Sequence, residues 1–429
     1  MLTRSDKASI IADCMTELDV SALINVQQAI RILDSVAVSP RTERIQLRNA
    51  LGRRLAQSIN ADRDCPPFDR SQMDGYAVRQ ADVTTTPVEL QIVGEIAAGV
   101  SFDGTLEAGQ AIAIMTGAPL PAGADGVVPI ENTQQLDDNK VRIERADNPA
   151  RMVAARGSDC RAGKVILEAG DELGPAQIAA AAFVGAAEVE VFQRQRVAVL
   201  STGNELVDLS ETPGSSTIRD SNGPMLVALL TKWGCDVTDL GRCRDEADVV
   251  RASLERGLAF DALFVTGGMS MGAYDFVPRT LIDLGVELKI TRLRIKPGKP
   301  FVFGTKVSGD RHFFIFGLPG NPVSAFVCAS RFASRVIARV GGGNPAEPWL
   351  TGRLGVGLPA NGPREFYQPA IRIVPPGKDS THGEFATITP LEWVGSADLF
   401  TLARANALIV RPENDPPLPK GTIVRVLSI

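Results

Sequence analysis

The sequence is poor in residues on which several classes of protein depend. It contains two histidines, His312 and His382, so a metal site built from several imidazoles is excluded. Aromatic residues make up only 5% of the chain and the formal net charge is −5, which argues against a basic surface that stacks nucleic-acid bases. We therefore expect no nucleic-acid partner.

Paired cysteines and long apolar runs are also lacking. None of the six cysteines belongs to a CxxC pair or has the spacing of zinc ligands, which favours a reduced chain in the cytoplasm. The longest uncharged run, 313–330, contains Pro319 and Pro322 and does not predict a membrane span. The N-terminal segment lacks the apolar core of a signal peptide. We expect a cytoplasmic protein with no membrane partner.

What the sequence does contain predicts several domains. The chain has 429 residues, 44% of them hydrophobic and 22% charged, and it is too long for one hydrophobic core. Composition and periodicity change along it, and GGGNP at 341–345 is typical of a linker. The predicted domains are a discontinuous α+β domain over 21–59 and 149–190, a β-rich domain over 60–148, an α/β domain over 191–341 and a C-terminal β domain over 346–429.

The α/β domain has the most regular pattern. From Arg196 onward, strands and helices alternate, which predicts a parallel sheet with helices on both faces. Three apolar runs, Ala262–Thr266, Phe301–Gly304 and Phe313–Phe316, are predicted to be buried strands bordered by Gly-rich polar turns. Because ligands of open α/β sheets bind beyond the carboxyl ends of the strands, we place the candidate site at these turns.

Two of the turns, KPGKP and GLPGNP, have the chemistry of an anion site. Lys296 and Lys299 supply positive charge, and Asn321 stands at the start of a predicted helix, where backbone N–H groups are exposed. Two alternatives stay open. Asn321 and the proline after it are also what a capped helix start requires, and lysines are commonly solvated surface charges.

Four acidic residues each follow a predicted strand: Glu205, Asp220, Asp245 and Asp275. Taken singly, each is typical of a helix cap or a turn. Taken together, they ring one edge of the sheet beside two lysines, and this combination predicts Mg²⁺ and a phosphorylated ligand.

The GMSMG segment at 268–272 matches the G-x-S-x-G pattern of a nucleophilic serine in α/β-hydrolases. Such a serine needs a base, and His312 and His382 are the two histidines that the chain offers. A serine hydrolase is the alternative function.

The β-rich domain begins with a dense polar loop, CPPFDRSQMDGYAVR at 65–79, and it includes a strand exit, MTGAP at 115–119. Asp69, Asp74 and Thr116 are its candidate ligand-binding residues. Turn chemistry alone explains the same residues, because Asp-Gly and Gly-Ala-Pro segments are common in turns.

Eight long motifs occur in an order that resembles one known family. They are FDRSQMDGYAV, MTGAPLPAGADGVV, VLSTGNEL, DSNGPML, TGGMSMGAYDF, IKPGKPFVFG, GLPGNPVSAF and GSADLFTLARANALIV. Together they resemble the MoeA-type molybdopterin molybdenumtransferases, a family that includes the E domain of gephyrin. The resemblance covers about residues 20–429.

The resemblance implies a multidomain α/β protein, with a MogA-like parallel sheet domain, small β-rich domains and a C-terminal β domain. It implies a homodimer that inserts molybdate into adenylylated molybdopterin with Mg²⁺, releases AMP and forms the molybdenum cofactor. A molybdopterin adenylyltransferase is then the upstream donor of the substrate. A non-catalytic scaffold is a further alternative, since gephyrin uses this domain to bind receptor loops.

The resemblance also implies functional residues. The implied catalytic residues are Glu205, Asp245, Asp275, Lys296 and Lys299, of which Asp245 and Asp275 are the implied metal ligands. The implied substrate-binding residues are Asp69, Asp74, Thr116, Asp159, Ser201, Gly203, Gly267, Gly268, Ser270, Pro319, Gly320, Asn321, Arg364 and Ser396. Asp69, Asp74 and Thr116 are implied to face the pocket of the other subunit.

Overall fold

The computed structural model describes residues 23–269, 276–374 and 385–429, which divide into two compact units. Unit 1 comprises the chain up to residue 43 together with 192–429, and unit 2 comprises 44–191. Unit 1 therefore joins two segments that lie far apart in the sequence. Among the described residues, no helix is both long enough and apolar enough to cross a membrane.

The core of unit 1 is a six-stranded sheet in the order β16-β13-β17-β21-β20-β18. Four of its strands are parallel, as the alternation predicted: β13 (Arg196–Thr202), β16 (Asp236–Cys243), β17 (Ala262–Thr266) and β21 (Arg311–Leu318). At one edge, β20 (Val302–Ser308) runs antiparallel to β21. The last strand, β18 (Glu287–Ile290), pairs antiparallel with β20 and so runs in the same direction as the other four. The two residues between β20 and β21 can join only antiparallel strands, because a parallel pair needs a long crossover.

The reversed direction of β20 decides where the KPGKP turn lies. The turn precedes β20, and Val302 at the start of this strand pairs with Gly317 near the end of β21. The turn thus lies at the predicted edge of the sheet, beside the carboxyl ends of β17 and β21. The turn lies at this edge because β20, the strand that follows it, begins there. The sequence pattern had instead suggested that the turn follows the end of a strand.

Helices cover both faces of this sheet. One face carries α4 (Asn222–Lys232), α7 (Pro322–Cys328) and α8 (Ser334–Val340), and the other carries α5 (Ala247–Gly257) and α6 (Phe276–Asp283). Neighbouring strand residues point to opposite faces, so Phe264 packs with the first set of helices and Leu263 and Val265 pack with the second. The predicted sheet with two covered faces is present.

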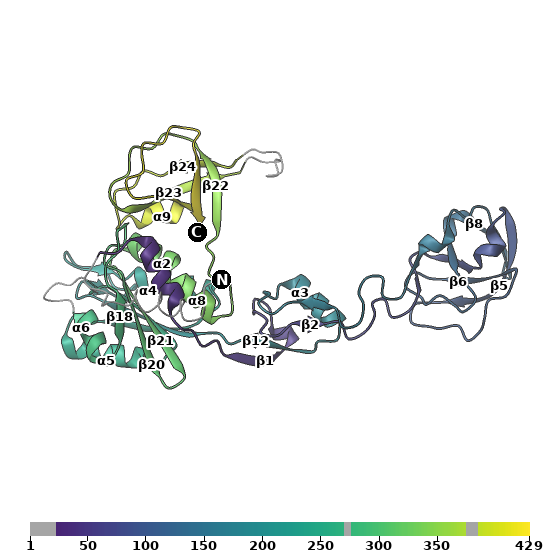
Figure 1. Cartoon of the computed structure of the whole chain (residues 1–429), viewed down its shortest axis with the longest axis horizontal. Helices are drawn as coiled ribbons and strands as arrows, with labels where there is room; N and C mark the ends of the chain where they lie inside the picture. The colour runs from purple at the N-terminus through teal and green to yellow at the C-terminus, as the bar shows by residue number, and fades with distance from the viewer. Residues whose placement is uncertain (1–22, 270–275, 375–384) are drawn as a thin grey trace, which may run out of the picture. The chain divides into compact units, whose positions relative to one another are not determined.

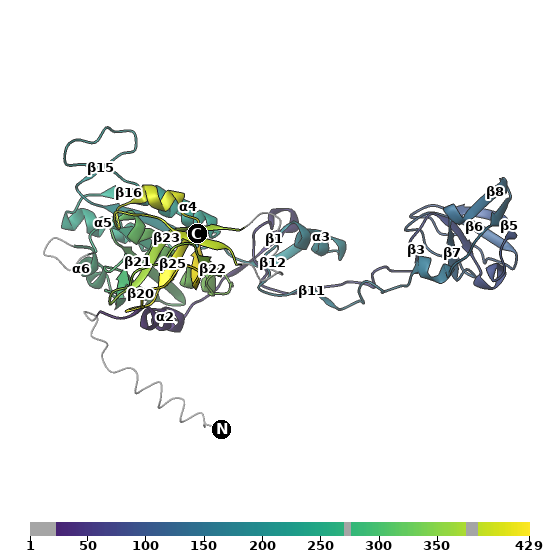
Figure 2. The same ribbon diagram turned by 90° about the horizontal axis from the view of Figure 1, so that it is seen from above.

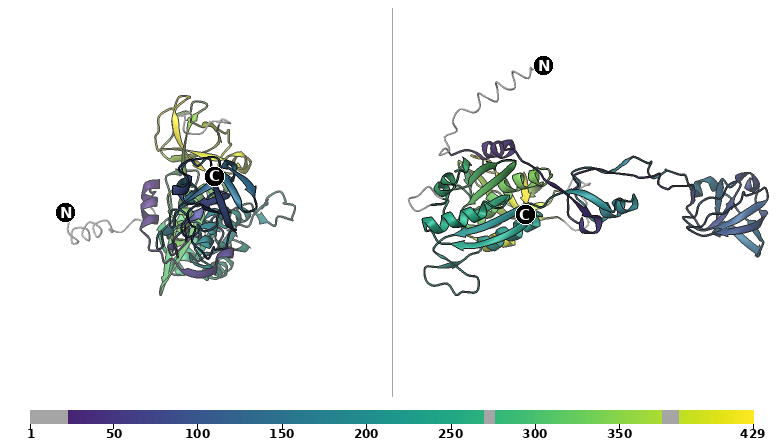
Figure 3. Two further views of the ribbon diagram at one scale, coloured as in Figure 1. Left: turned by 90° about the vertical axis from the view of Figure 1, so that its right-hand side faces the viewer. Right: turned by 90° about the horizontal axis from the view of Figure 1, so that it is seen from below.

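Helix α2 (Val26–Ser35) also belongs to unit 1, which corrects the predicted domain over 21–59 (Figures 1 and 3). Its apolar stripe, Val26, Ala29 and Leu33, is buried in the core beneath α4, α7 and α8. A capping box between Asn25 and Gln28 starts the helix. The apolar stripe of the helix does not reveal its packing partner in the sequence, because periodicity does not say which core an apolar face covers.

The C-terminal part of unit 1 is a closed β-barrel of β22 (Trp349–Leu354), β23 (Glu365–Ile373), β24 (Thr387–Pro390), β25 (Ala407–Arg411) and β26 (Ile423–Ser428). Closure comes from the additional pairing of β23 with β25. Small and apolar residues such as Ala370, Ile388 and Ile409 fill its interior. A short strand of the α/β domain, β19 (Ile295–Lys296), adds to β23, so the barrel is hydrogen-bonded to the segment that carries the lysines.

Unit 2 contains two cores. The first is built around β1 (Thr42–Gln46), β2 (Ile59–Asn60), α3 (Pro175–Phe183), β11 (Val165–Leu167) and β12 (Glu188–Phe192), with Leu47, Leu55 and Val191 buried among them. The second is a six-stranded sheet in the order β7-β4-β6-β5-β9-β8. Its strands are β4 (Gly75–Val78), β5 (Val88–Ile96), β6 (Gln110–Ile114), β7 (Gly126–Pro129), β8 (Thr133–Asp137) and β9 (Lys140–Ile143).

Candidate functional site

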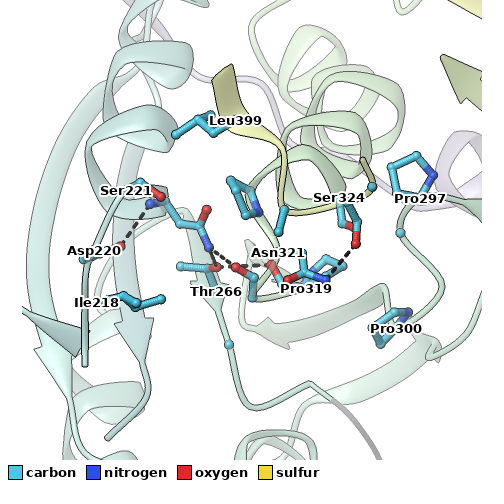
Figure 4. A pocket seen from close by; sticks show the side chains of 18 of the residues that line it. Ile218, Asp220, Ser221, Thr266, Pro297, Pro300, Pro319, Asn321, Ser324 and Leu399 are labelled. Atoms are coloured by element: carbon cyan, nitrogen blue, oxygen red, sulfur yellow. Dashed lines mark hydrogen bonds between the residues drawn. The ribbon is translucent and has the colours of Figure 1, made fainter. Parts of the chain in front are cut away.

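A pocket of about 1020 Å³ opens in unit 1 at the carboxyl edge of the α/β sheet (Figure 4). Its walls are the strand ends of the sheet, the KPGKP turn and a segment of the C-terminal domain from Trp393 to Phe400. It is lined by ten of the residues that the sequence singled out: Glu205, Asp220, Gly267, Lys296, Lys299, Pro319, Gly320, Asn321, Arg364 and Ser396.

Several other candidates lie next to the pocket rather than in its wall. Ser201 lies near the end of β13, Gly203 directly follows this strand, and both residues are buried. Gly268 adjoins Asp245, since a Cβ at Gly268 would lie 4.0 Å from the Asp245 Oδ1. The backbone N–H of Asp245 donates to Asn204 Oδ1 at 3.2 Å. Ser270 and Asp275 lie outside the described residues.

The lysine turn and the C-terminal barrel form a cationic wall. Lys296 pairs with Phe366 in the β19–β23 ladder, and Arg364 stands just before β23, so the two cations come from neighbouring strands. Lys299 follows in the turn, whose backbone carbonyl accepts from Leu293 N–H at 2.9 Å. Glycine is required at 298 (φ 116°), because a Cβ there would meet the Cys328 sulfur. The exposed lysines therefore line a shared pocket rather than an open surface.

Asn321 does not act as the cap that the alternative explanation required. It holds the N-cap position of α7, but its side chain makes no capping hydrogen bond. Its amide nitrogen instead donates to Ser396 Oγ at 2.8 Å, and Val323 N–H donates to the Ser396 carbonyl at 3.1 Å. Asn321 thus connects the GLPGNP turn to the C-terminal domain at the rim of the pocket.

A hydrogen-bonded floor joins three elements beneath the pocket. The Asn222 amide nitrogen donates to Thr266 Oγ1 at 2.8 Å and to the Gly320 carbonyl at 2.7 Å. Thr266 Oγ1 in turn donates to the Pro319 carbonyl at 3.3 Å. Figure 4 shows these bonds linking the start of α4, the end of β17 and the turn before α7.

Sequence reasoning selected Pro319 and Gly320 but missed the polar side chains at this floor. Asn222, Thr266 and Thr202 all line the pocket, yet none was selected as a site residue. Their position in the sequence could have identified them as site residues, because each lies at a strand end or a helix start on the carboxyl edge of the sheet. Thr and Asn are too common at such places for the pattern alone to select them.

Three polar atoms around the floor have no hydrogen-bond partner among the described residues: Ser201 Oγ, Thr202 Oγ1 and Asn222 Oδ1. The three residues are 1%, 2% and 8% exposed. Buried polar atoms are nearly always hydrogen-bonded, so these atoms mark places where a bound molecule or an ordered water completes the structure.

The pocket also has an acidic side. Asp220 Oδ1 accepts from the N–H groups of Asn222 and Gly223, both at 3.0 Å, so this carboxylate sits on the N-terminus of α4. It has the turn-forming role proposed for single acids, and it lines the pocket as well. Glu205 folds over Gly203, where a Cβ would lie 2.5 Å from the Glu205 Oε2. Glycine at 203 therefore leaves room for this carboxylate.

Asp69, Asp74, Thr116 and Asp159 belong to unit 2. There Asp74 Oδ1 accepts from both the N–H (2.7 Å) and the hydroxyl (2.8 Å) of Thr116, and these two bonds lower the pKa of Asp74. Asp69 Oδ1 accepts from Arg156 N–H at 2.7 Å, and Arg70 forms an ion pair with Asp159 at 3.3 Å. The structure thus brings these loops together, with contacts that turn chemistry also explains.

The structure describes one of the two residues that were implied as metal ligands. Among the described residues, no group of three or more His, Cys, Asp or Glu side chains is close enough to hold a metal ion. Asp245, one of the two implied ligands, is described, and its carboxylate is the hard oxygen donor that suits Mg²⁺. The second implied ligand, Asp275, lies outside the described ranges.

The hydrolase alternative loses one of its two candidate bases. His312 lies near the start of β21, whereas the Gly267–Gly268 turn lies beside the end of that strand, where Thr266 pairs with Leu318. Six strand residues separate the two ends, which corresponds to roughly 20 Å. His312 is therefore too far away to serve a serine at this turn. The other histidine, His382, lies outside the described ranges.

Comparison with known proteins adds information independent of the pocket. Three family profiles match the chain in sequence: the MoeA N-terminal region (domains I and II) over 24–185, a probable molybdopterin binding domain over 198–339, and the MoeA C-terminal region (domain IV) over 351–429.

Relatives match over almost the whole chain. A molybdopterin molybdenumtransferase from a Nostoc species is 35% identical over 397 residues, covering 90% of this chain and 89% of its own. The one from Bacillus subtilis is 32% identical over 422 residues, covering 95% and 94%. The crystal structure of a molybdopterin biosynthesis MoeA protein from Pyrococcus horikoshii covers 95% of this chain and 100% of its own, with 26% identity and a TM-score of 0.78.

Proposed function

The chain belongs to the MoeA family of molybdopterin molybdenumtransferases, and we propose on that basis that it inserts molybdenum, supplied as molybdate, into adenylylated molybdopterin. The products are the molybdenum cofactor and AMP. The observation that carries the proposal is that Lys296, Lys299 and Arg364 form a cationic wall in the same pocket as a polar floor. Such a pocket suits a substrate that has both oxyanions and a neutral heterocycle.

The cationic wall provides most of what the reaction requires. Molybdate and the phosphate groups of the substrate repel each other in water, and three positive side chains lower this repulsion when both are bound. Holding the two reactants side by side also removes much of the entropic barrier to their reaction. No protein nucleophile is needed, which agrees with a chain that has two histidines.

Mg²⁺ dependence is part of the proposal. Asp245 and Glu205, with Asp275, are the residues that would hold the ion, and carboxylate oxygens are its preferred protein ligands. When bound, Mg²⁺ supplies positive charge that stabilises the departing phosphate. The role of the carboxylates themselves is to position the ion and to leave the lysines free for the oxyanions.

The proposal extends to partners. We propose a homodimer in which Asp69, Asp74 and Thr116 of one protomer serve the pocket of the other, supported by the FDRSQMDGYAV and MTGAP motifs. A molybdopterin adenylyltransferase is the proposed upstream donor, since the substrate must arrive already adenylylated. The cytoplasm is the proposed compartment, which agrees with cysteines that are free wherever the structure describes them.

A direct assay tests the function. The protein is incubated with adenylylated molybdopterin, molybdate and Mg²⁺, and AMP is measured by chromatography while the cofactor is measured by reconstitution of an apo-molybdoenzyme. Lys299→Met removes one charge of the cationic wall and should lower both products strongly. Lys289→Met is the matched control, because Lys289 pairs with Glu287 and does not line the pocket. Equal product from wild type and Lys299→Met would contradict the proposal.

A further inference from the structure

The pocket has two unlike halves. Figure 4 shows Ile218, Asp220 and Ser221 on one side and the prolines of the lysine turn, Pro297 and Pro300, on the other. The lysine side carries the cations described above. The Asp220 side carries acceptor oxygens, which belong to Glu205, Asp220 and Asn222. Arg219 also lines this side, but its Nε is bonded to the Leu209 carbonyl at 2.9 Å.

The orientation of the Asn222 amide is fixed by its partners. The Gly320 carbonyl accepts hydrogen bonds and cannot donate, so the amide nitrogen must face it. The same nitrogen donates to Thr266, whose own hydroxyl proton is directed to the Pro319 carbonyl. Both amide protons are therefore used, and Oδ1 is left as a buried acceptor without a partner among the described residues.

The chemistry of this acceptor restricts what can bind it. A partner for Asn222 Oδ1 must donate an N–H or O–H. Molybdate and ionised phosphate have only acceptor oxygens near neutral pH, so neither can satisfy it. The carboxylate of Asp220 already occupies the start of α4 and repels a second anion there. Thr202 Oγ1, also without a partner among the described residues, lies near Gly267 and Gly268 and can either donate or accept.

We infer that Asn222 and Thr202 recognise a hydrogen-bond-donating edge of the organic part of the substrate, while its oxyanions lie at the lysine turn. This inference rests on the proposed function for the identity of the substrate. Three parts of that substrate carry such donors: the amino and ring N–H groups of the pterin, the ribose hydroxyls of the adenylyl group, and the 6-amino group of its adenine. The two residues are specificity-determining, and they set which end of the substrate lies on which side of the pocket.

The test is a binding cycle that changes the donor on the ligand and the acceptor on the protein. Full-length protein in EDTA is titrated calorimetrically with pterin-6-carboxylate and with the 2-oxo analogue, lumazine-6-carboxylate, which lacks the amino group. A second arm uses AMP, its 2′-deoxy and 3′-deoxy forms, and inosine monophosphate, which lacks the adenine amino group. Wild type should bind one native ligand about tenfold more tightly than its analogue, the usual effect of one unmet buried hydrogen bond. The arm that shows the difference identifies the donor.

Thr202→Val keeps the shape of the side chain and removes its hydroxyl. In this variant the tenfold difference should shrink but not vanish, because one of the two proposed acceptors has been removed while Asn222 Oδ1 remains. Thr280→Val is the matched control, since Thr280 is buried on α6 outside the pocket, and it should keep the tenfold difference. Thr202→Val should also melt at or above the wild-type temperature, because the hydroxyl has no protein partner to lose.

Three results would overturn the inference. One is equal binding of native ligands and analogues to wild type, or no measurable binding of any of them at millimolar concentration. Another is an unchanged tenfold difference in Thr202→Val. The third is a difference that appears only when Mg²⁺ replaces EDTA, since the two oxygens would then serve the waters of a metal ion. This test measures binding in the absence of molybdate and does not depend on the transferase assay. A negative transferase assay would therefore contradict the proposed function without changing the outcome of the binding test.

Discussion

The ammonium nitrogen of Lys296 lies 4.6 Å from the centroid of the Phe366 ring, and the two residues are partners in the β19–β23 ladder. A cation over an aromatic face is attracted by the negative charge of the ring face. The contact ties the lysine turn of the α/β domain to the C-terminal barrel, which itself contributes Arg364 to the same wall. The cationic wall is thus built by two domains, and its geometry depends on the strand pair between them.

Substituting Phe366 should therefore weaken substrate binding more than catalysis. Phe366→Leu keeps an apolar side chain but removes the ring, and a partly exposed cation–π contact contributes about 0.5–1 kcal/mol. We expect the KM for adenylylated molybdopterin to rise about two- to fivefold with little change in kcat. Lys296→Met should have a larger effect, since it removes the charge as well. A fall in kcat at constant KM in Phe366→Leu would mean that the ring acts on the chemical step instead.

Much of the α/β domain was predictable because its signals are local. The alternation of strand and helix patterns predicted α4 to α6 and the parallel strands. The Gly-rich turns predicted the edge of the sheet that carries Lys296 and Lys299. The antiparallel direction of β20 was not predicted. It follows from the two-residue connection to β21, and that connection was hidden because the expected strands at 301–304 and 313–316 were too short.

Contacts between distant segments account for the rest. The packing partner of α2 could not be read from its own amphipathic pattern. The floor residue Asn222 was missed because its importance comes from Thr266 and Gly320, which reach it through the fold. The segment 341–345 has the composition of a free linker, yet Gly343 N–H donates to the Ala338 carbonyl and Arg335 donates to the Pro345 carbonyl.

A buried charge network near this segment predicts a large loss of stability. Arg331, 3% exposed, pairs with Glu347 and donates to Tyr367 Oη at 2.6 Å, while Arg335 pairs with Glu347 and with Asp34 of α2. Removing one partner of a buried pair typically costs about 3–5 kcal/mol. The loss of stability in Arg331→Met should lie near the lower end of this range, because Arg335 still neutralises Glu347.

Thermal melting of full-length protein measures this effect. Arg331→Met should lower the melting temperature of the transition that includes the C-terminal barrel. Arg251→Met is the control, since its pair with Asp283 is exposed on both sides and should contribute less than about 1 kcal/mol. Similar melting temperatures for both variants would show that the network contributes no more than a surface ion pair.

Burial predicts an order of thiol reactivity. It raises the pKa of Cys235 to about 12 and that of Cys243 to about 11, and it raises the pKa of Cys328 still further above the usual range. At pH 8 these groups are protonated thiols, which are poor nucleophiles, whereas Cys160 is only half-buried. Among the cysteines that the structure describes, iodoacetamide should modify Cys160 first, as measured by peptide mass spectrometry, and unfolding in urea should remove the difference. Early labelling of Cys328 in the folded protein would contradict the buried core around it.

The Asp74–Thr116 contact makes a prediction about pH. The Thr116 N–H and hydroxyl both lower the pKa of Asp74, so the carboxylate stays ionised in the folded protein below its usual range. Its contribution to stability is present above the pKa of the unfolded chain and is lost as pH falls through the folded value. Thr116→Val keeps the N–H donor, so the pKa of Asp74 should rise only part of the way to its usual value. Carboxyl ¹³C NMR titration measures this pKa, and an unchanged value would exclude the hydroxyl as a cause.

The proposed dimer predicts that inactive chains can rescue each other. If Asp74 serves the partner's pocket, an Asp74→Ala chain mixed with a Lys299→Ala chain forms heterodimers in which one of two pockets has both residues intact. Random mixing makes half of the dimers mixed, so we expect about a quarter of wild-type activity. The control mixes Lys296→Ala with Lys299→Ala chains; both residues line the same pocket of unit 1, so no intact pocket arises and no activity should return. If purified heterodimers of the first pair remain inactive, Asp74 and Lys299 do not serve one shared site across subunits.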